Sequence, residues 1–366
     1  MSQGTYNTLV DHMRLEMSIG AYKAAAEKTS DISRFYSLSA QLLHAEFPEE
    51  IAFVDSASRG WNLIMYGLNI TSKDKIITLS SEYGTNLLTI YDIAYKTGCS
   101  VQVIPCDETG CFSIDDVENE IKSGGTVLAV SHVAAQGSII NPVIELGRLA
   151  KKYGVVYVVD GCQAVGQIPV NLKDIECTAY MTAGRKWLRG PRGTGILYVK
   201  KGSPLRSPQI DLASSDLVFN EKGEVSGIKV REDAKQFELW EKSTASVLAL
   251  TNAISEYLVY GEEKVAREIL IKANKIRKHI QQNKNLQLVG KLEATTGVSS
   301  FYMQDVSREE SVKRMLEKCG FIISIICDWD CPVFFPKNAT SIFRISPHFY
   351  TSERDVEEIC KTIDSI

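Results

Sequence analysis

Short apolar runs alternate with helix-length amphipathic stretches over about the first 205 residues of the chain. Seven runs of four to six residues read as strands: 51–54, 75–79, 100–104, 126–131, 155–159, 179–182 and 196–199. Between them, apolar residues recur with helical spacing at 58–68, 84–97, 113–122 and 142–153. Near-continuous apolar strands separated by helices are typical of a mainly parallel sheet with both faces covered. We therefore predict a large α/β domain.

The pattern differs on either side of this region. Helical spacing predicts two helices before it, at 8–28 and 32–46, and the polar stretch 216–235 predicts loops with a hairpin. The remaining predictions are helices at 243–260, 262–282 and 352–364 and strands at 297–303 and 320–327. We expect an N-terminal segment (1–30) packing on the small domain, a large α/β domain (31–240) and a small α+β domain (241–366).

Composition narrows the class of protein. The 366 residues carry 41 basic and 45 acidic side chains, a net charge of −4. Without a basic excess to neutralise a phosphate backbone, we expect no nucleic-acid partner. No stretch reaches the roughly 20 apolar residues of a membrane helix, and the polar start predicts no signal peptide. Nine irregularly spaced cysteines fit reduced thiols in the cytoplasm better than a disulfide framework.

Polar residues with complementary chemistry follow the predicted strands. In open α/β sheets, ligands bind beyond the carboxyl ends of the strands. Asp160 follows the strand at 155–159, and Lys186 follows the strand at 179–182. A lysine can form a Schiff base with an aldehyde cofactor, and an aspartate can keep a pyridinium nitrogen protonated. The turn at 56–58 offers backbone N–H groups and hydroxyls for a phosphate, and Tyr83 offers a ring for stacking. These groups together match pyridoxal phosphate (PLP), and without zinc motifs we predict no metal.

Two long motifs resemble those of class V aminotransferase-fold enzymes. They are Val-Asp-Gly-Cys-Gln-Ala-Val-Gly at 159–166 and Gly-Arg-Lys-Trp-Leu-Arg-Gly-Pro-Arg-Gly-Thr-Gly at 184–195. That group includes cysteine desulfurases, selenocysteine lyases, isopenicillin-N-epimerase-like proteins and the C–S lyase of ergothioneine synthesis. The resemblance covers residues of about 10–360. It implies PLP fold type I, with a mainly parallel seven-stranded sheet, and a homodimer whose active site is shared between subunits.

The resemblance also implies roles for individual residues. Lys186 matches the Schiff-base lysine, Asp160 the partner of the ring nitrogen, and Arg344 the arginine that binds the substrate carboxylate. The other residues that match cofactor-binding positions are Ala57, Ser58, Tyr83, Gln163, Thr182 and Arg185. We further expect His132 and Gln136 to line the substrate site, and Ser243 and Thr244 to reach the partner's phosphate.

The cysteines leave the reaction open. Desulfurases keep a persulfide cysteine shortly before the carboxylate-binding arginine, where this chain has Cys327 and Cys331. Their surroundings do not match the desulfurase loop, whereas the segments 16–22 and 236–241 are similar to the ergothioneine-type branch. We therefore predict a C–S lyase that releases pyruvate and ammonia from a cysteine S-conjugate, or its sulfoxide, by β-elimination. The alternatives are a cysteine desulfurase or selenocysteine lyase, a class V aminotransferase or epimerase, and a non-catalytic regulatory protein.

Overall fold

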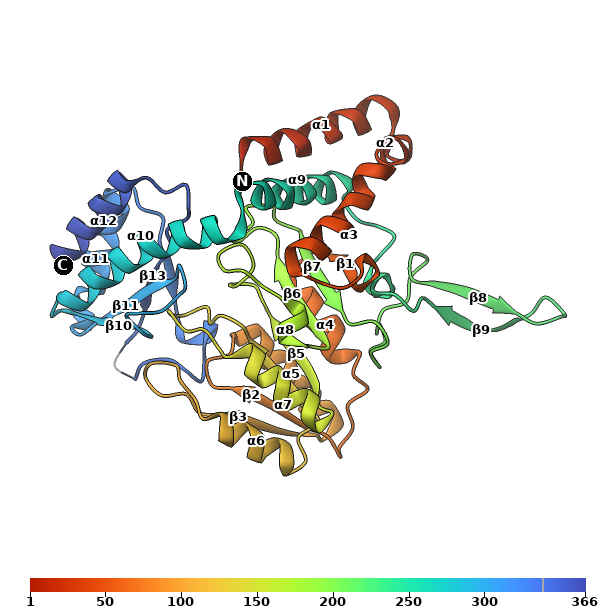
Figure 1. Cartoon of the computed structure of the whole chain (residues 1–366), viewed down its shortest axis with the longest axis horizontal. Coiled ribbons are helices and arrows are strands. Elements are labelled where there is room, and N and C mark those ends of the chain that lie inside the picture. Colours follow the sequence, from red (N-terminus) through yellow and green to blue (C-terminus); the bar gives the residue numbers. More distant parts are fainter. Residues whose placement is uncertain (338) are drawn as a thin grey trace.

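A computed structural model describes residues 1–337 and 339–366 of the chain. Its centre is a seven-stranded sheet with the order β1-β7-β6-β5-β4-β2-β3 (Figure 1). The strands are β1 (Ile51–Val54), β2 (Lys75–Leu79), β3 (Ser100–Ile104), β4 (Val127–Ser131), β5 (Val156–Asp160), β6 (Ala179–Ala183) and β7 (Gly195–Val199). The pairs β2–β3, β2–β4, β4–β5 and β5–β6 are parallel, and β7 pairs antiparallel with β6 and β1. The predicted mainly parallel seven-stranded sheet is confirmed.

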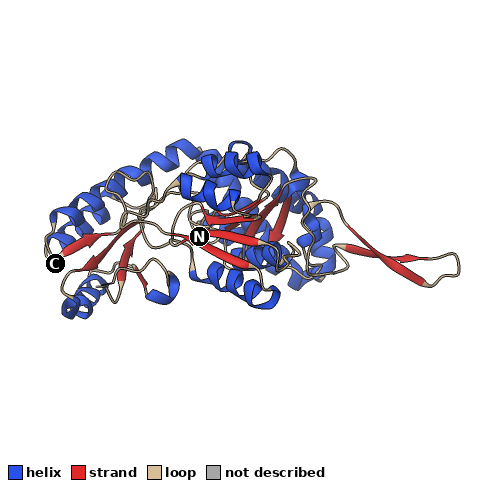
Figure 2. Ribbon diagram, turned by 90° about the horizontal axis from the view of Figure 1, so that it is seen from below, coloured by secondary structure: helices blue, strands red, loops and turns tan. Residues whose placement is uncertain are grey.

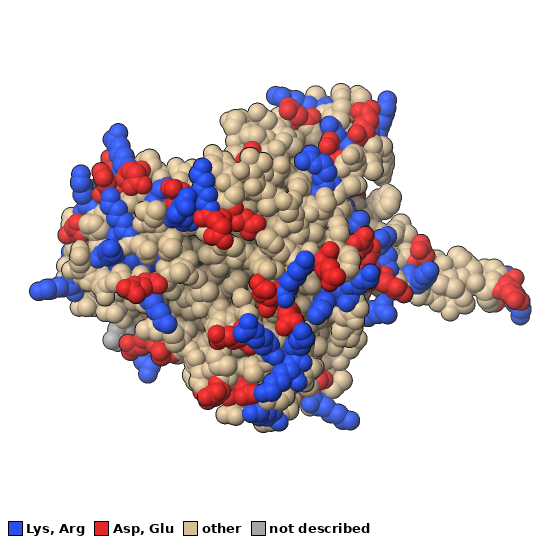
Figure 3. All heavy atoms as spheres, viewed as in Figure 1, with Lys and Arg blue, Asp and Glu red and all other residues tan. Residues whose placement is uncertain are grey.

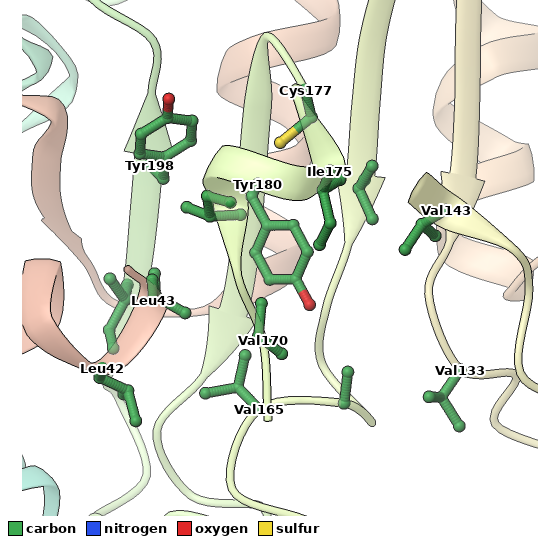
Figure 4. Close-up of a cluster of buried hydrophobic side chains, with 14 of the residues drawn as sticks. Leu42, Leu43, Val133, Val143, Val165, Val170, Ile175, Cys177, Tyr180 and Tyr198 are labelled. Atoms are coloured by element: carbon green, nitrogen blue, oxygen red, sulfur yellow. The ribbon is translucent and has the colours of Figure 1, made fainter. Parts of the chain in front are cut away.

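Helices cover both faces of this sheet, as the continuous apolar strands require. One face packs against α4 (Ala57–Tyr66) and α5 (Gly84–Thr97). The elements on the other face are α3 (Thr29–Leu43), α6 (Ile114–Lys122), α7 (Val143–Tyr153), α8 (Leu172–Ile175) and α9 (Thr244–Tyr260). Figure 4 shows part of the core beneath this second group, where Tyr180 of β6 lies near Val170 and Ile175.

The N-terminal segment forms two helices where the sequence pattern predicted a single helix at 8–28. The chain forms α1 (Gln3–Ile19) and α2 (Ala21–Glu27), because Gly20 adopts a positive φ of 88° that ends the first helix. Helix α1 runs along α9 (Figure 1), and the buried side chains of α9 join the core of the large sheet. Within the described ranges, no helix combines the length and apolar character needed to cross a bilayer. The domain boundaries at residues 30 and 240 stay predictions.

A second sheet and a separate core form the C-terminal part of the molecule. The four antiparallel strands lie in the order β10 (Leu286–Leu288), β11 (Ser299–Met303), β13 (Ile342–Ile345), β12 (Ser324–Ile326). Their core includes side chains of α10 (Glu262–Gln282), α11 (Glu309–Lys318) and α12 (Glu353–Asp364). The sequence pattern did not predict α11, β10 or β13. The two strands have three and four residues, too few to show a clear period.

A hairpin projects away from both sheets. It consists of β8 (Ser215–Phe219) and β9 (Val225–Val230), within the stretch for which a hairpin is predicted. Figures 1 and 2 show it extending from the side of the large sheet, far from the C-terminal part. Among the described residues its two strands form a sheet of their own, and nearly all of their residues are exposed.

Candidate active site

A cavity of about 560 Å³ opens where the carboxyl ends of the large sheet's strands meet the small sheet. Four parallel strands deliver side chains to it, as expected for an open α/β sheet. The structure brings ten of the predicted site residues to its walls: Ala57, Ser58, Tyr83, Gln136, Asp160, Gln163, Arg185, Lys186, Cys331 and Arg344. These residues are separated by up to 287 positions in the sequence, 344 minus 57. The predicted constellation is therefore one physical site.

Three predicted residues do not line this cavity. Thr182 points to the opposite face of β6 from Ala183, because successive strand side chains alternate, and its hydroxyl donates to the Gly161 carbonyl at 3.4 Å. His132 is buried, with Nδ1 2.9 Å from the Tyr180 hydroxyl, and burial lowers its pKa to about 4. Cys327 is half-buried outside the cavity lining.

Asp160 is held firmly at the end of β5. The residue is 7% exposed, and both of its carboxylate oxygens accept hydrogen bonds. Oδ1 accepts from the backbone N–H of Cys162 at 2.8 Å, and Oδ2 accepts from the Asn86 side chain at 2.8 Å. Two donors on separate oxygens fix the direction of the carboxylate. It is therefore suited to hold a cationic N–H group of a ligand.

The loop that carries Lys186 is fixed by its neighbours. Lys186 itself is half-buried and lines the cavity. The next residue, Trp187, donates from its indole N–H to Oε1 of Gln163 at 3.0 Å. The Trp187 carbonyl accepts from Nε2 of His348 at 2.9 Å, since Nδ1 of that ring already accepts from the Phe349 N–H. Burial lowers the pKa of His348 to about 4, so the ring is neutral and this tautomer is fixed.

Arg344 reaches the cavity from the small sheet. Its Nη1 donates to the Ala135 carbonyl at 2.8 Å, and its Nη2 donates to the Ser324 hydroxyl at 3.0 Å. Its Nε is buried without a hydrogen-bond partner. Burial lowers the pKa of the guanidinium, and the nearby Asp330 opposes this shift. An unpartnered buried donor is destabilising by about 1–3 kcal/mol, so an anionic ligand that meets it recovers this energy.

Cys331 follows a short turn that packs on the large domain. The residue is 1% exposed, and burial together with Asp330 and Asp328 raises the pKa of its thiol to about 12. The turn approaches the start of α5 so closely that a Cβ on Gly84 would lie 2.4 Å from the Trp329 carbonyl oxygen. Glycine at this position therefore lets the cysteine segment close over the cavity.

The first turn of α4 also lines the cavity. Ser56 caps this helix by accepting from the Arg59 N–H at 3.1 Å, and the free N–H groups of Ala57 and Ser58 follow. Helix N-termini bind phosphate through such groups and through the helix dipole. The exposed Arg185 adds a positive charge to the same cavity.

Several residues of the site were not predicted. Asn86 lines the cavity, and Glu82 lies fully buried behind it. Trp187 and His348 also line the cavity. The spacing of Glu82 and Asn86 was the available signal, because residues four apart at the start of a helix share a face. Their burial depends on β4 and β5, which the local pattern does not specify.

The residues present fit PLP. An amine, a fixed carboxylate, a helix N-terminus and an aromatic ring are the groups that bind its aldehyde, ring nitrogen, phosphate and ring face. They are supplied by Lys186, Asp160, α4 and Tyr83 in one cavity. The unpartnered Oε1 of Gln136 and Nε of Arg344 leave polar atoms for a substrate.

Comparison with known proteins also indicates a PLP-dependent enzyme. The aminotransferase class-V family matches residues 7–359. A probable cysteine desulfurase of Pyrococcus abyssi is 26% identical over 362 residues, covering 96% of this chain and 87% of the relative. A cysteine desulfurase of Yersinia pseudotuberculosis is 26% identical over 350 residues, covering 95% of this chain and 85% of the relative.

Solved structures share the fold. The apo structure of a cysteine desulfurase from Thermococcus onnurineus is 24% identical, with a TM-score of 0.87 over 99% of this chain and 93% of that one. A cystine C–S lyase in complex with its product, cysteine persulfide, is 18% identical, with a TM-score of 0.87 over 100% and 95%. The predicted PLP fold type I is confirmed. The chain therefore belongs to the aminotransferase class-V family of enzymes, and its cofactor is pyridoxal phosphate.

Proposed function

We propose that this enzyme removes sulfur from cysteine, as a desulfurase, with Cys331 as the sulfur acceptor. The observation that carries this proposal is the position of Cys331, which lines the same cavity as Lys186 and Arg344. Full-length similarity to proteins named cysteine desulfurases supports it. It reverses the preference for a conjugate lyase drawn from the local motifs at 16–22 and 236–241.

The proposed mechanism assigns one task to each residue. When bound, PLP supplies an electron sink for negative charge at the α-carbon of an amino acid. Arg344 binds the substrate carboxylate, using the Nε that has no partner within the protein. The amine of Lys186 takes the proton from the α-carbon as general base. Asp160 keeps the ring nitrogen protonated, and Tyr83 stacks on the ring.

Sulfur then moves from substrate to protein. The Cys331 thiolate attacks the substrate sulfur, so that an S–S bond forms and the bond from sulfur to the β-carbon breaks. The electron pair of the broken bond remains with the substrate, which becomes alanine after protonation. The balance is cysteine plus Cys331 thiol giving alanine plus Cys331 persulfide. The nine cysteines are all free thiols, and we propose that the enzyme works in the reducing cytoplasm.

A C–S lyase is the second candidate, and a specific observation favours it. Burial raises the pKa of the Cys331 thiol to about 12, which disfavours the thiolate that a desulfurase needs. A lyase needs no acceptor thiol. It breaks the bond between the β-carbon and sulfur, so that the sulfur leaves with the group attached to it. Water then hydrolyses the remaining three-carbon fragment to pyruvate and ammonia.

Product analysis distinguishes the two reactions. The purified enzyme is incubated with free cysteine and, separately, with a cysteine S-conjugate sulfoxide, and products are identified by mass spectrometry. We expect alanine from free cysteine. We also expect the peptide that contains Cys331 to gain the mass of one sulfur atom, about 32 Da. Cys331→Ser abolishes both signals, whereas the matched control Cys327→Ser, outside the cavity, preserves them. Lys186→Ala abolishes every reaction.

The opposite outcome is equally clear. Pyruvate and ammonia from the conjugate, at a rate that Cys331→Ser leaves unchanged, would establish the lyase and overturn the desulfurase. Alanine without a protein persulfide would remove Cys331 from the mechanism.

We also propose that the enzyme is a homodimer held in part by the hairpin β8–β9. Four apolar side chains of the hairpin are each more than half exposed: Leu217, Phe219, Val225 and Ile228. Figure 3 shows the hairpin largely free of charged side chains between its base and its end. An exposed apolar surface of this kind is typical of an interaction site. The assignment of Ser243 and Thr244 to a partner's phosphate stays a prediction.

A further inference from the structure

Glu82 is a buried carboxyl group behind the active-site cavity, and the mechanism above does not use it. It lies between the end of β2 and the start of α5, and the residue is 1% exposed. It does not line the cavity. Charged side chains are rarely buried this completely unless their hydrogen bonds are satisfied. The hydrogen bonds of Glu82 therefore indicate its role.

Four donors converge on this carboxyl group. Oε1 accepts from the backbone N–H of Tyr83 at 2.8 Å and from the side-chain nitrogen of Asn86 at 2.9 Å. Oε2 accepts from the backbone N–H of Ser131 at 2.6 Å, and the Ser131 hydroxyl also bonds to Oε1. Each oxygen therefore faces at least one N–H donor. Only a carboxyl group meets this requirement, because an amide would turn N–H toward N–H on one side.

Asn86 connects this group to the cavity. The nitrogen that donates to Glu82 donates its second hydrogen to Oδ2 of Asp160 at 2.8 Å. The amide group is planar, so fixing one N–H on Glu82 also fixes the direction of the other. The reverse orientation of the amide would place its oxygen against two carboxyl groups, so the hydrogen bonds determine the assignment.

We propose that Glu82 is a positioning residue: through the shared amide of Asn86, it holds the Asp160 carboxylate in the orientation that meets the ring nitrogen of PLP. This inference rests on the role proposed above for Asp160. Glu82 touches neither cofactor nor substrate, and it acts only through Asn86. The proposal explains why a buried acid occupies a position where an apolar side chain is otherwise favoured.

The charge state of Glu82 fits this task. Burial and the charge of Asp160 raise the pKa of Glu82 to about 7, against the opposing effect of its hydrogen bonds. Asp160 on β5 is the charged group that faces it, and the groups that face it from β4 and α5 are neutral: Ser131, Tyr83 and Asn86. A protonated Glu82 donates to the Ser131 hydroxyl and still accepts from the backbone and Asn86. The network therefore keeps its connections while the second negative charge beside Asp160 is removed.

The test compares Glu82→Gln, Asn86→Ala and Asp160→Asn with the unchanged enzyme. Apoprotein of each is titrated with PLP, and the visible absorption of the bound cofactor is followed against pH. We expect Glu82→Gln and Asn86→Ala each to weaken PLP binding by about ten- to hundredfold, the loss typical of a hydrogen bond to a charged group. The pH midpoint of the visible absorption should move upward, because a ring without its proton withdraws less charge from the nitrogen linked to Lys186.

Glu50 provides the matched control. It is another buried carboxylate, 4% exposed, and it accepts from the backbone N–H groups of Phe47 and Lys201, away from the cavity. Glu50→Gln should lower stability without changing the affinity for PLP or the midpoint. Asn86→Ala leaves Glu82 with its backbone donors, so it remains informative even if Glu82→Gln does not fold.

The outcomes separate this inference from the function on which it rests. In one outcome, Asp160→Asn changes both the PLP affinity and the pH midpoint, whereas Glu82→Gln and Asn86→Ala keep the affinity within about twofold and leave the midpoint unchanged. The positioning role is then overturned, and the role of Asp160 stands. If Asp160→Asn also changes nothing, both are overturned. If Glu50→Gln reproduces the shifts, they report general destabilisation, and the positioning role is again rejected.

Discussion

At the scale of single residues, Glu82 also makes stability depend on pH. Its pKa is about 7 in the folded chain and near 4.5 when unfolded, so between these values only the folded state keeps the proton. The free energy of unfolding therefore falls as pH rises through this window, by at most about 3 kcal/mol from this group. Urea unfolding of the apoprotein at about pH 5 and about pH 8 measures the fall. Glu82→Gln should reduce it, and an identical fall in both proteins would show that Glu82 does not cause it.

Sequence motifs located the site residues but could not tell which face they occupy. Asp160 and Lys186 lie within long motifs and reach the cavity as predicted. Thr182 and Ala183 are neighbours on β6, and a shift of one position places the side chain on the other face of the sheet. The motif alone did not distinguish them. Asn86 was missed because its partners come from β5 and from Glu82, contacts that only the folded chain creates.

At the scale of elements, the approach of the 328–330 turn to α5 depends on Gly84. An alanine Cβ there would meet the Trp329 carbonyl oxygen at 2.4 Å, which is backbone and cannot rotate away. We expect Gly84→Ala to displace the turn together with Cys331. The rate of alanine formation from cysteine should then fall at least about tenfold, while PLP affinity changes by less than about threefold.

Gly60 serves as the control for this prediction. It lies within α4, and an added Cβ would only make ordinary contact with Met181 at 3.4 Å. Gly60→Ala should therefore preserve the rate and the affinity, since alanine favours a helix. An undiminished rate in Gly84→Ala would mean that the position of the turn does not limit the reaction.

The length and the local pattern of each element decide whether the sequence predicts it. Strands β1 and β2 of the large sheet have the predicted bounds, because each is a short run of mostly apolar residues between turn residues. Strand β13 was not predicted, although it carries Arg344, since its four residues take their pairing from β11 and β12. The break between α1 and α2 was also missed, because a single glycine within a helical period is often tolerated.

At the scale of the whole molecule, the proposal that the hairpin β8–β9 holds a dimer can be tested by measuring the molecular mass. Its apolar side chains are exposed and lie outside both cores, because the hairpin projects from the body (Figure 2). Burying them against a second copy would remove this apolar surface from water. We therefore expect the double variant Phe219→Asp, Ile228→Asp to convert the dimer to monomers, as measured by light scattering during gel filtration.

The control for this prediction is Ile322, a fully exposed apolar residue just before β12. Figure 1 shows the C-terminal part, to which β12 belongs, far from the hairpin. Ile322→Asp adds the same kind of charge and should leave the mass of a dimer unchanged. If the active site is shared between subunits, the hairpin variant should also lose PLP affinity in proportion to the fraction of monomer, so that raising the protein concentration restores both together. A monomeric mass for the unchanged enzyme would overturn the dimer. A dimer that survives both hairpin charges would place the interface on another surface.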